Sequence, residues 1–320
     1  MPVLFLYCNA LKIETQRKNG INSKEKSMKY LEKHPMIMIV TGVIGISLSS
    51  IFVKYSAAPS TVTAAFRLLW TVLLMSPIVW TKKDVREELL HIRKKALLLS
   101  VLSGLFLAIH FAVWFESLKH TSVASSTTIV CTEVIWVALG FCLFLKGKLA
   151  IKAVGAIGVT FAGSVLIAYA DSVTGESHLY GDLLALLSAM AVAVYMLLGR
   201  VVRENVSTSV YTYVVYVSCT AALLIMCFIQ RFQIFSYGIN AVIVGFLLAL
   251  FSTILGHSIF SWCLKYFSPA FVSASKLCEP VVAAILAAFL FGEMPTGLQV
   301  LGGLLILVGV FYYSRIEKEE

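Results

Sequence analysis

The sequence predicts an all-α polytopic membrane protein, with ten transmembrane helices arranged as two inverted repeats of five helices. Hydrophobic residues make up 59% of the 320 residues and charged residues only 13%, which is about half the charged share of a soluble domain. After residue 34 the chain falls into apolar runs of about 20 residues, the length that crosses a hydrocarbon core about 30 Å thick. No run alternates like a barrel strand, so backbone groups in lipid must pair within helices.

The ten predicted spans divide evenly between two halves of the chain. They lie at 35–56, 61–80, 96–117, 123–145 and 151–170, and then at 180–199, 209–230, 239–264, 268–291 and 296–314. The predicted domains are therefore a first repeat over 35–172, a second over 180–315, and a cytoplasmic tail at 316–320.

The first 34 residues are predicted to be a cytoplasmic segment. A short apolar stretch comes first and a basic stretch follows, which is the reverse of the order in a signal peptide. We therefore expect Met28 to be the natural start and residues 1–27 to be an upstream extension; N-terminal sequencing of the natively expressed protein tests this.

Lysine and arginine residues set the predicted orientation. The two chain ends and the loops after the even-numbered spans hold 21 of the 26. Because basic residues accumulate on the cytoplasmic side, both termini are predicted to be cytoplasmic, in the plasma membrane. Five crossings per repeat then insert the second copy upside down relative to the first, an architecture common in secondary transporters.

A repeat of 146 residues supports the duplication. LKHTSVASSTTIVCTEVIWVALGFCLFL (118–145) aligns with LKYFSPAFVSASKLCEPVVAAILAAFLF (264–291), so that Glu133 meets Glu279. Each carboxylate lies near the middle of an apolar span, where a charge costs several kcal/mol unless it faces protein or water. Two such carboxylates at equivalent positions indicate a duplicated functional pathway.

The chain resembles the EamA-type branch of the drug/metabolite transporter superfamily. The segment SLKHTSVASST (117–127) is similar to that branch's junction between helices three and four. CEPVVAAILAAFLFGEMPTGLQVLGGLLILVGV (278–310) is similar to its helices nine and ten. The resemblance covers residues 35 to 315 and implies a transporter, with a cavity between helices one to four and six to nine. It also implies export. The residues themselves do not indicate a direction of transport.

Two positions depart from the family pattern. Val134 stands where a proline would pair with Pro280, and Lys146-Gly147 replaces the Gly-Glu turn of the second copy.

Glu133 and Glu279 are the predicted proton-coupling residues, because a desolvated carboxylate can load and release a proton near neutral pH. The alternative is a structural pair, with Lys276 one turn before Glu279 on the same helix face. Lys276 is itself predicted either to bind an anionic group of the substrate or only to pair with Glu279. Arg67 lies about 10 Å inside the outer end of its span, and either extends to the surface or reaches the central cavity beside Glu133.

His110 and Trp114 lie four residues apart on one face of span three and are predicted to contact the substrate. A packing histidine and an interfacial tryptophan are the more common outcomes for such residues. Pro280 removes a helix hydrogen bond beside Glu279, so it is predicted to be a hinge or a static kink.

Small residues in spans five and ten allow close helix contact. They predict a scaffold, or a homodimer through helices five and ten as the alternative to a monomer: Ala156, Thr160, Ser164, Gly302, Gly303 and Gly309.

Other functional classes find little support in the sequence. The net charge of +9 comes from short loops, so no nucleic-acid partner is expected. No phosphate-binding loop, Gly-x-Ser-x-Gly or His-Glu-x-x-His motif occurs, which argues against an ATP-driven pump or an enzyme. No cofactor, metal or catalytic residue is predicted. The sequence therefore predicts a proton-coupled exporter of a small metabolite, such as an amino acid or related compound, with membrane lipid, protons and that solute as partners. An importer or facilitator, and a non-transporting sensor or scramblase, are the alternatives.

Overall fold

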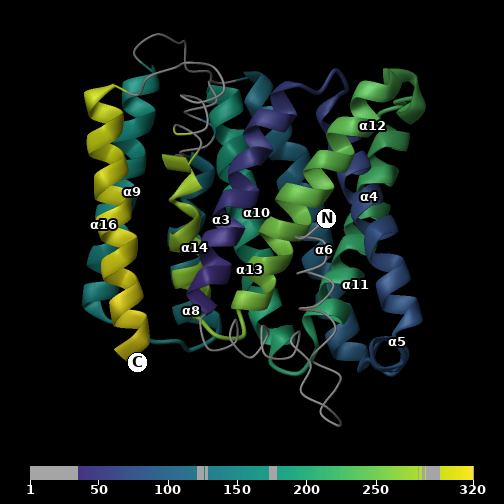
Figure 1. Ribbon diagram of the computed structural model, residues 1–320, viewed down its shortest axis with the longest axis horizontal. Coiled ribbons are helices and arrows are strands. Elements are labelled where there is room, and N and C mark those ends of the chain that lie inside the picture. The colour runs from purple at the N-terminus through teal and green to yellow at the C-terminus, as the bar shows by residue number, and fades with distance from the viewer. Residues whose placement is uncertain are drawn as a thin grey trace. The chain divides into compact units, whose positions relative to one another are not determined.

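The computed structural model describes residues 35–120, 126, 129–172, 179–279, 281–282, 285 and 296–319. Every regular element in these residues is a helix, which confirms the predicted all-α class (Figure 1). The elements are α3 (Pro35–Lys54), α4 (Ser60–Thr81), α5 (Lys83–Leu90), α6 (Lys94–His120), α8 (Glu133–Phe144), α9 (Ile151–Ser172), α10 (Leu179–Arg203), α11 (Thr208–Ile229), η1 (Ile234–Tyr237), α12 (Gly238–Leu247), η2 (Leu248–His257), α13 (Ser258–Cys263), α14 (Pro269–Lys276) and α16 (Gly297–Glu319).

Six helical stretches in the described residues are long and apolar enough to cross a membrane, and three shorter apolar helices accompany them. The long ones are Pro35–Val53, Ser60–Thr81, Lys94–His120, Leu179–Arg203, Thr208–Ile229 and Ile234–Cys263. Each predicted span therefore contains a helix, although α14 covers only the beginning of the ninth.

Local sequence signals explain several helix starts. Ser207 caps α11 by accepting a hydrogen bond from the Val210 amide at 3.3 Å, and Ser268 caps α14 through the Phe271 amide at 3.2 Å. A serine hydroxyl in this position satisfies an amide that the helix leaves unpaired.

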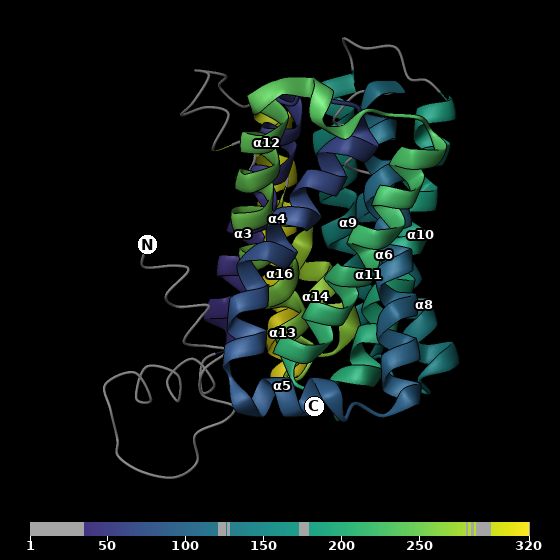
Figure 2. The same ribbon diagram turned by 90° about the vertical axis from the view of Figure 1, so that its right-hand side faces the viewer.

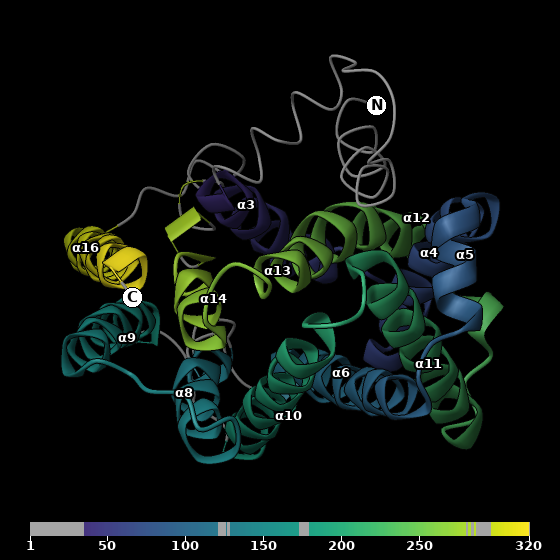
Figure 3. The same cartoon turned by 90° about the horizontal axis from the view of Figure 1, so that it is seen from below.

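Two elements differ from the prediction. The eighth span is one irregular stretch, in which the ten-residue π-helix η2 separates α12 from α13. The short helix α5 follows α4 where a loop was expected, and it lies crosswise to its neighbours (Figures 2 and 3).

The helices form two compact units that differ from the two sequence repeats. Unit 1 comprises residues 1–105 and 198–266, and unit 2 comprises residues 106–197 and 267–320. Each unit therefore combines segments of both repeats, and α6 and α10 contribute residues to both units.

In unit 1, α4 packs against α11 and α12, and α3 packs against η2. The contact between α3 and η2 is close, because a Cβ atom on Gly45 would lie 2.8 Å from the Phe251 carbonyl oxygen. Glycine is therefore the residue that allows the two backbones to approach at this point.

In unit 2, α9 packs along α16, as Figure 1 shows at the left, and α14 packs against α8. A Cβ atom on Gly163 would lie 2.6 Å from the Gly302 carbonyl oxygen, and one on Gly309 would clash with Thr160. The small residues of α9 and α16 thus allow these two helices to pack closely within unit 2, as expected of a scaffold. A homodimer through the same two helices stays a prediction.

Candidate functional site

A buried ion pair in unit 2 joins the two repeats. Lys276 Nζ lies 2.9 Å from Glu133 Oε1, and the two side chains are only 10% and 6% exposed. Ser273 Oγ donates a hydrogen bond to the same carboxylate oxygen at 2.9 Å, and Lys276 Nζ also lies 3.3 Å from the sulfur of Met196. Both charges thereby have polar partners, without which burying them would be very costly.

Helix ends stabilise the same two charges. Glu133 is the first residue of α8 and Lys276 is the last residue of α14. A helix carries partial positive charge at its N-terminus and partial negative charge at its C-terminus. The carboxylate and the ammonium therefore each sit at the helix end that favours their charge.

Equivalent irregular turns precede the carboxylates in the two repeats. The Thr132 amide bonds to the Ile129 carbonyl, and the Cys278 amide bonds to the Ser275 carbonyl, both with i to i−3 spacing. The two turns are related by the 146-residue repeat. Discontinuous helices of this kind line the sites of many transporters.

The first of these turns forms without a proline. Val134 occupies the position equivalent to Pro280, and the turn at Thr132 is nevertheless present. Pro280 itself lies outside the described residues, so its predicted role as a hinge is untested.

Glu279 belongs to the same neighbourhood. It is half-buried, and Glu133, Glu279 and Lys276 all act electrostatically on the buried thiol of Cys131. One alternative from the sequence pairs Glu279 with Lys276, and this stays a prediction. The structure adds an ion pair between Lys276 and Glu133, on the other repeat.

His110 and Trp114 form a second polar and aromatic group in unit 2. The two rings stack with their centroids 5.9 Å apart and 14° between their planes. His110 Nδ1 lies 2.7 Å from Ser188 Oγ on α10. Both rings are buried, so Trp114 is not an exposed interfacial residue.

The two groups lie at different heights along α10. Ser188 contacts His110 and Met196 contacts Lys276. Eight residues of α-helix separate Ser188 from Met196, which is about 12 Å at 1.5 Å per residue.

Three buried donor atoms on α6 and α8 have no hydrogen-bond partner within the described part of the chain: Trp114 Nε1, Thr132 Oγ1 and Trp136 Nε1. Thr132 directly precedes Glu133 in the sequence. Trp136 lies four residues after Thr132, so these two residues share a helix face. Buried indole N–H groups normally find an acceptor, so these atoms are suited to contact a solute. Sequence reasoning did not identify Thr132, Trp136 or Ser273, because such residues are common in apolar spans.

Arg67 lies in unit 1 and is buried, with 1% exposure. Its Nε donates to Thr253 Oγ1 at 2.7 Å, and its Nη1 donates to Ser49 Oγ at 3.3 Å. The prediction that its side chain extends to the surface is therefore wrong, because hydroxyls on α3 and η2 hold the guanidinium inside the unit.

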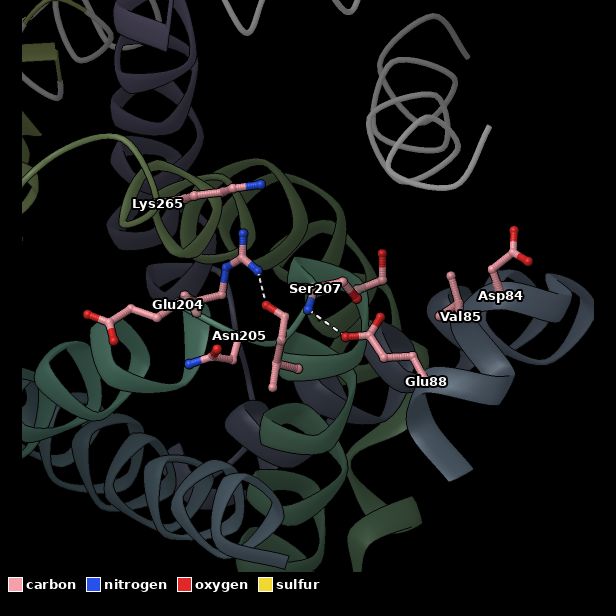
Figure 4. Close-up of a pocket in the computed structure, with 10 residues that line it drawn as sticks. Asp84, Val85, Glu88, Glu204, Asn205, Ser207 and Lys265 are labelled. Atoms are coloured by element: carbon pink, nitrogen blue, oxygen red, sulfur yellow. Dashed lines mark hydrogen bonds between the residues drawn. The ribbon is translucent and has the colours of Figure 1, made fainter. Parts of the chain in front are cut away.

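A pocket of about 360 Å³ lies at the end of unit 1 that is predicted to face the cytoplasm. In Figure 4 the carboxylate of Glu88 points to the Ser207 amide, which donates a hydrogen bond to it at 2.7 Å. Buried Arg203 donates to the carbonyls of Ser261 and Val206. These contacts fix helix ends to one another, a role that the loop charges in the sequence did not reveal. The pocket is lined by Asp84, Val85, Glu88, Arg203, Glu204, Asn205, Val206, Ser207, Ser209 and Lys265.

Within the described residues, no group of histidine, cysteine, aspartate and glutamate side chains is arranged to hold a metal ion.

Comparison with known proteins relates this fold to a transporter family. Residues 34–169 and, separately, residues 179–315 match the EamA-like transporter family. Two similar Bacillus subtilis (strain 168) proteins are described as uncharacterized transporters. YxxF is 25% identical over 309 residues, covering 92% of each chain. YyaM is 25% identical over 301 residues, covering 90% of this chain and 95% of its own.

A solved crystal structure shares the fold. Its TM-score with this chain is 0.73 at 15% sequence identity, and the match covers 88% of this chain and 97% of the other. The two family matches span most of the sequence, and they show that the chain belongs to the EamA-like transporter family.

Proposed function

We propose that the protein is a secondary active transporter of the plasma membrane that exports a small polar or amphipathic metabolite by alternating access, coupled to protons. The observation that carries this proposal is the buried Glu133–Lys276 pair in unit 2, with Glu279 beside it. Ionisable groups within a transmembrane region are expensive, and they mark solute pathways or proton relays in membrane proteins.

A count of charges gives the proposed coupling step. Glu133, Glu279 and Lys276 carry one excess negative charge when all three are ionised, and uptake of one proton neutralises the group. Protonation weakens the hold of the carboxylates on Lys276, whose ammonium is then available to an anionic group of the solute.

The remaining contacts to the solute come from the unpartnered donors. Trp114 and Trp136 supply indole faces and N–H groups, and Thr132 supplies a hydroxyl beside Glu133. His110, stacked on Trp114, adds an imidazole ring that can donate or accept a hydrogen bond. Arg67 provides a contact for an anionic group, and Pro280 is the proposed hinge.

The test follows the metabolites inside and outside cells that express the protein, by mass spectrometry. Wild type is compared with Glu133→Gln and Glu279→Gln, each with and without a protonophore. We expect wild-type cells to deplete one metabolite class, and expect the protonophore or either substitution to abolish the depletion. Glu116→Gln is the matched control, because Glu116 pairs with Lys119 at an exposed helix end.

Four other results would contradict parts of the proposal. Depletion that survives both substitutions would make the carboxylates structural. Accumulation in place of depletion would identify an importer, and solute movement that never runs uphill would identify a facilitator. The absence of any solute movement, in export and in uptake assays, would favour a non-transporting sensor or a scramblase.

A further inference from the structure

We infer that the pocket at the end of unit 1 binds a small organic amine in its cationic ammonium form. The groups assigned to hold the ammonium are the carboxylates of Asp84 and Glu88 and the hydroxyls of Ser207 and Ser209, all of which line the pocket. The inference concerns binding within unit 1 alone. It therefore stands or falls independently of proton coupling at Glu133.

The pocket is a cavity of about 360 Å³, a volume typical of sites for small molecules. Every residue that lines it belongs to unit 1. Helix α5 forms one side, from which Asp84, Val85 and Glu88 project in Figure 4, and Ser207 lies at the start of α11. A ligand in this cavity would thus contact two helices of the same unit.

Two carboxylates of α5 line the pocket without a basic partner. Asp84 and Glu88 lie one turn apart on the same helix face, and neither forms an ion pair in the described part of the chain. Lys83 and Glu87 of the same helix are exposed and pair with each other at 3.8 Å. Glu88 Oε1 accepts a hydrogen bond from the Ser207 amide at 2.7 Å. The second oxygen of Glu88 and both oxygens of Asp84 can therefore accept from a ligand.

The hydroxyl group of Ser209 is the independent observation that indicates a ligand. Ser209 lines the pocket and is only 1% exposed, and its hydroxyl makes no hydrogen bond with the residues that the structure describes. Buried polar groups normally have a hydrogen-bond partner. Ser207 lies two residues earlier on the same pocket, and its Oγ accepts from the Val210 amide at 3.3 Å. A ligand in the pocket would supply the partner that Ser209 lacks.

Two basic side chains also line the pocket, and they do not reverse its charge. Buried Arg203 donates to backbone carbonyls, and Lys265 lies on the side of the pocket away from α5 in Figure 4. The three lining carboxylates, of Asp84, Glu88 and Glu204, exceed these two basic groups by one negative charge. The balance favours a cation, next to the carboxylates of α5.

The groups assigned to the ligand determine its class. Carboxylate oxygens only accept hydrogen bonds, and hydroxyls accept as well as donate, so the matching ligand carries N–H donors and a positive charge. Within the described residues, no three acidic, histidine or cysteine side chains are arranged to hold a metal ion. An ammonium group on a short carbon chain meets these conditions, with buried Val85 as an apolar contact for the chain.

The test measures the melting temperature of the full-length protein in detergent at pH 7, while butylammonium chloride replaces sodium chloride at constant ionic strength. Parallel series use tetramethylammonium chloride, which has the same charge but no N–H donor, and sodium butyrate, which supplies an anion. We expect butylammonium alone to raise the melting temperature by about 2–4 °C at about ten times its dissociation constant. The dependence of the melting temperature on concentration gives that constant.

Variants connect the shift to the pocket. Glu88→Gln keeps an acceptor for the Ser207 amide but removes the charge, so it should raise the dissociation constant at least about tenfold. Ser209→Ala and Asp84→Asn should each raise it by about threefold. If Glu88→Gln does not fold, these two variants decide the question.

Two matched controls should keep the wild-type dissociation constant. Glu87→Gln removes a carboxylate of α5 that pairs with Lys83 and does not line the pocket. Ser218→Ala removes a hydroxyl of α11 that is bonded to the Val214 carbonyl.

Four results would overturn the inference. Equal shifts with butylammonium and tetramethylammonium would show a general effect of cations on the protein. A shift with butyrate alone would show that the basic side chains, rather than the carboxylates, determine the ligand. Equal dissociation constants in wild type, Ser209→Ala and Asp84→Asn would place the amine elsewhere. The absence of a shift in all three series would show that the groups around the pocket only hold the helix ends together.

Discussion

Unit 1 and unit 2 each bury a basic side chain among apolar helices, and the described partners of the two side chains differ in charge. Arg67 in unit 1 donates to the hydroxyls of Ser49 and Thr253. Lys276 in unit 2 is paired with the carboxylate of Glu133. The printed contacts of the two cations therefore differ: neutral hydroxyls accept hydrogen bonds from Arg67, and a buried carboxylate pairs with Lys276.

This contrast shows why two similar cations are suited to different tasks. An ion pair is neutral as a whole, and a proton or a competing anion can open it. A guanidinium keeps its positive charge, because an arginine side chain is not deprotonated in proteins. Under the proposed function, we therefore expect charge to change in unit 2 during a transport cycle, whereas the charge of Arg67 in unit 1 stays constant.

The largest predicted effect belongs to the ion pair. Lys276→Met leaves Glu133 buried without the ammonium, and we expect it to lower the free energy of unfolding by about 3–5 kcal/mol. The double variant Glu133→Gln, Lys276→Met should recover most of this loss, because the carboxylate that pairs with Lys276 is then removed as well. Thermal unfolding in detergent measures the stability of the two single variants, Lys276→Met and Glu133→Gln, and of the double variant.

Losses that simply add in the double variant would contradict the pairing. The coupling would then be zero, and the two side chains would contribute to stability independently of each other.

A smaller effect is expected from the corresponding change in unit 1. Arg67→Gln removes the hydrogen bonds that the guanidinium donates to the hydroxyls of Ser49 and Thr253, so we expect a loss of about 1.5–3 kcal/mol. The same unfolding measurement checks it, with Arg67→Lys beside it as a variant that keeps the charge. A loss as large as that of Lys276→Met would erase the proposed difference between the units.

The smallest effect concerns the backbone contacts that support each unit. A Cβ atom on Gly45 in unit 1, or on Gly163 in unit 2, would collide with a carbonyl oxygen of the neighbouring helix. We expect Gly45→Ala and Gly163→Ala each to cost about 1–3 kcal/mol by overpacking. Gly158→Ala is the matched control on α9, since nothing lies within 4 Å of its Cβ position.

If Gly158→Ala and Gly163→Ala lowered the stability equally, the loss would have a cause other than the contact between α9 and α16. A loss confined to Gly163→Ala would confirm that close helix contact, rather than glycine itself, is required there.

The sequence alone was sufficient to predict the helices and to identify the two carboxylates within apolar spans. Apolar length predicts α4, α10 and α11 because hydrocarbon thickness fixes the length of a span. The 146-residue repeat identified Glu133 and Glu279, since a charge in the middle of an apolar run needs no tertiary information to be conspicuous.

The partners of the buried charges could not be predicted in the same way. Lys276 lies one turn before Glu279 in the sequence, whereas its pairing with Glu133 depends on the packing of α14 against α8. The π-helix η2 was missed because the hydrogen-bond spacing within a helix does not alter its apolar composition. Ser49 and Thr253 carry no signal of their own until Arg67 is placed between α3 and η2.

The composition of the two units has a consequence for biosynthesis. Each unit needs segments from both repeats, so neither core can be completed when the first five spans have left the ribosome. During that interval Glu133 has not yet met Lys276, and Arg67 has not met Thr253. Expression of the two repeats as separate polypeptides should therefore yield stable protein only when both are made in the same cell.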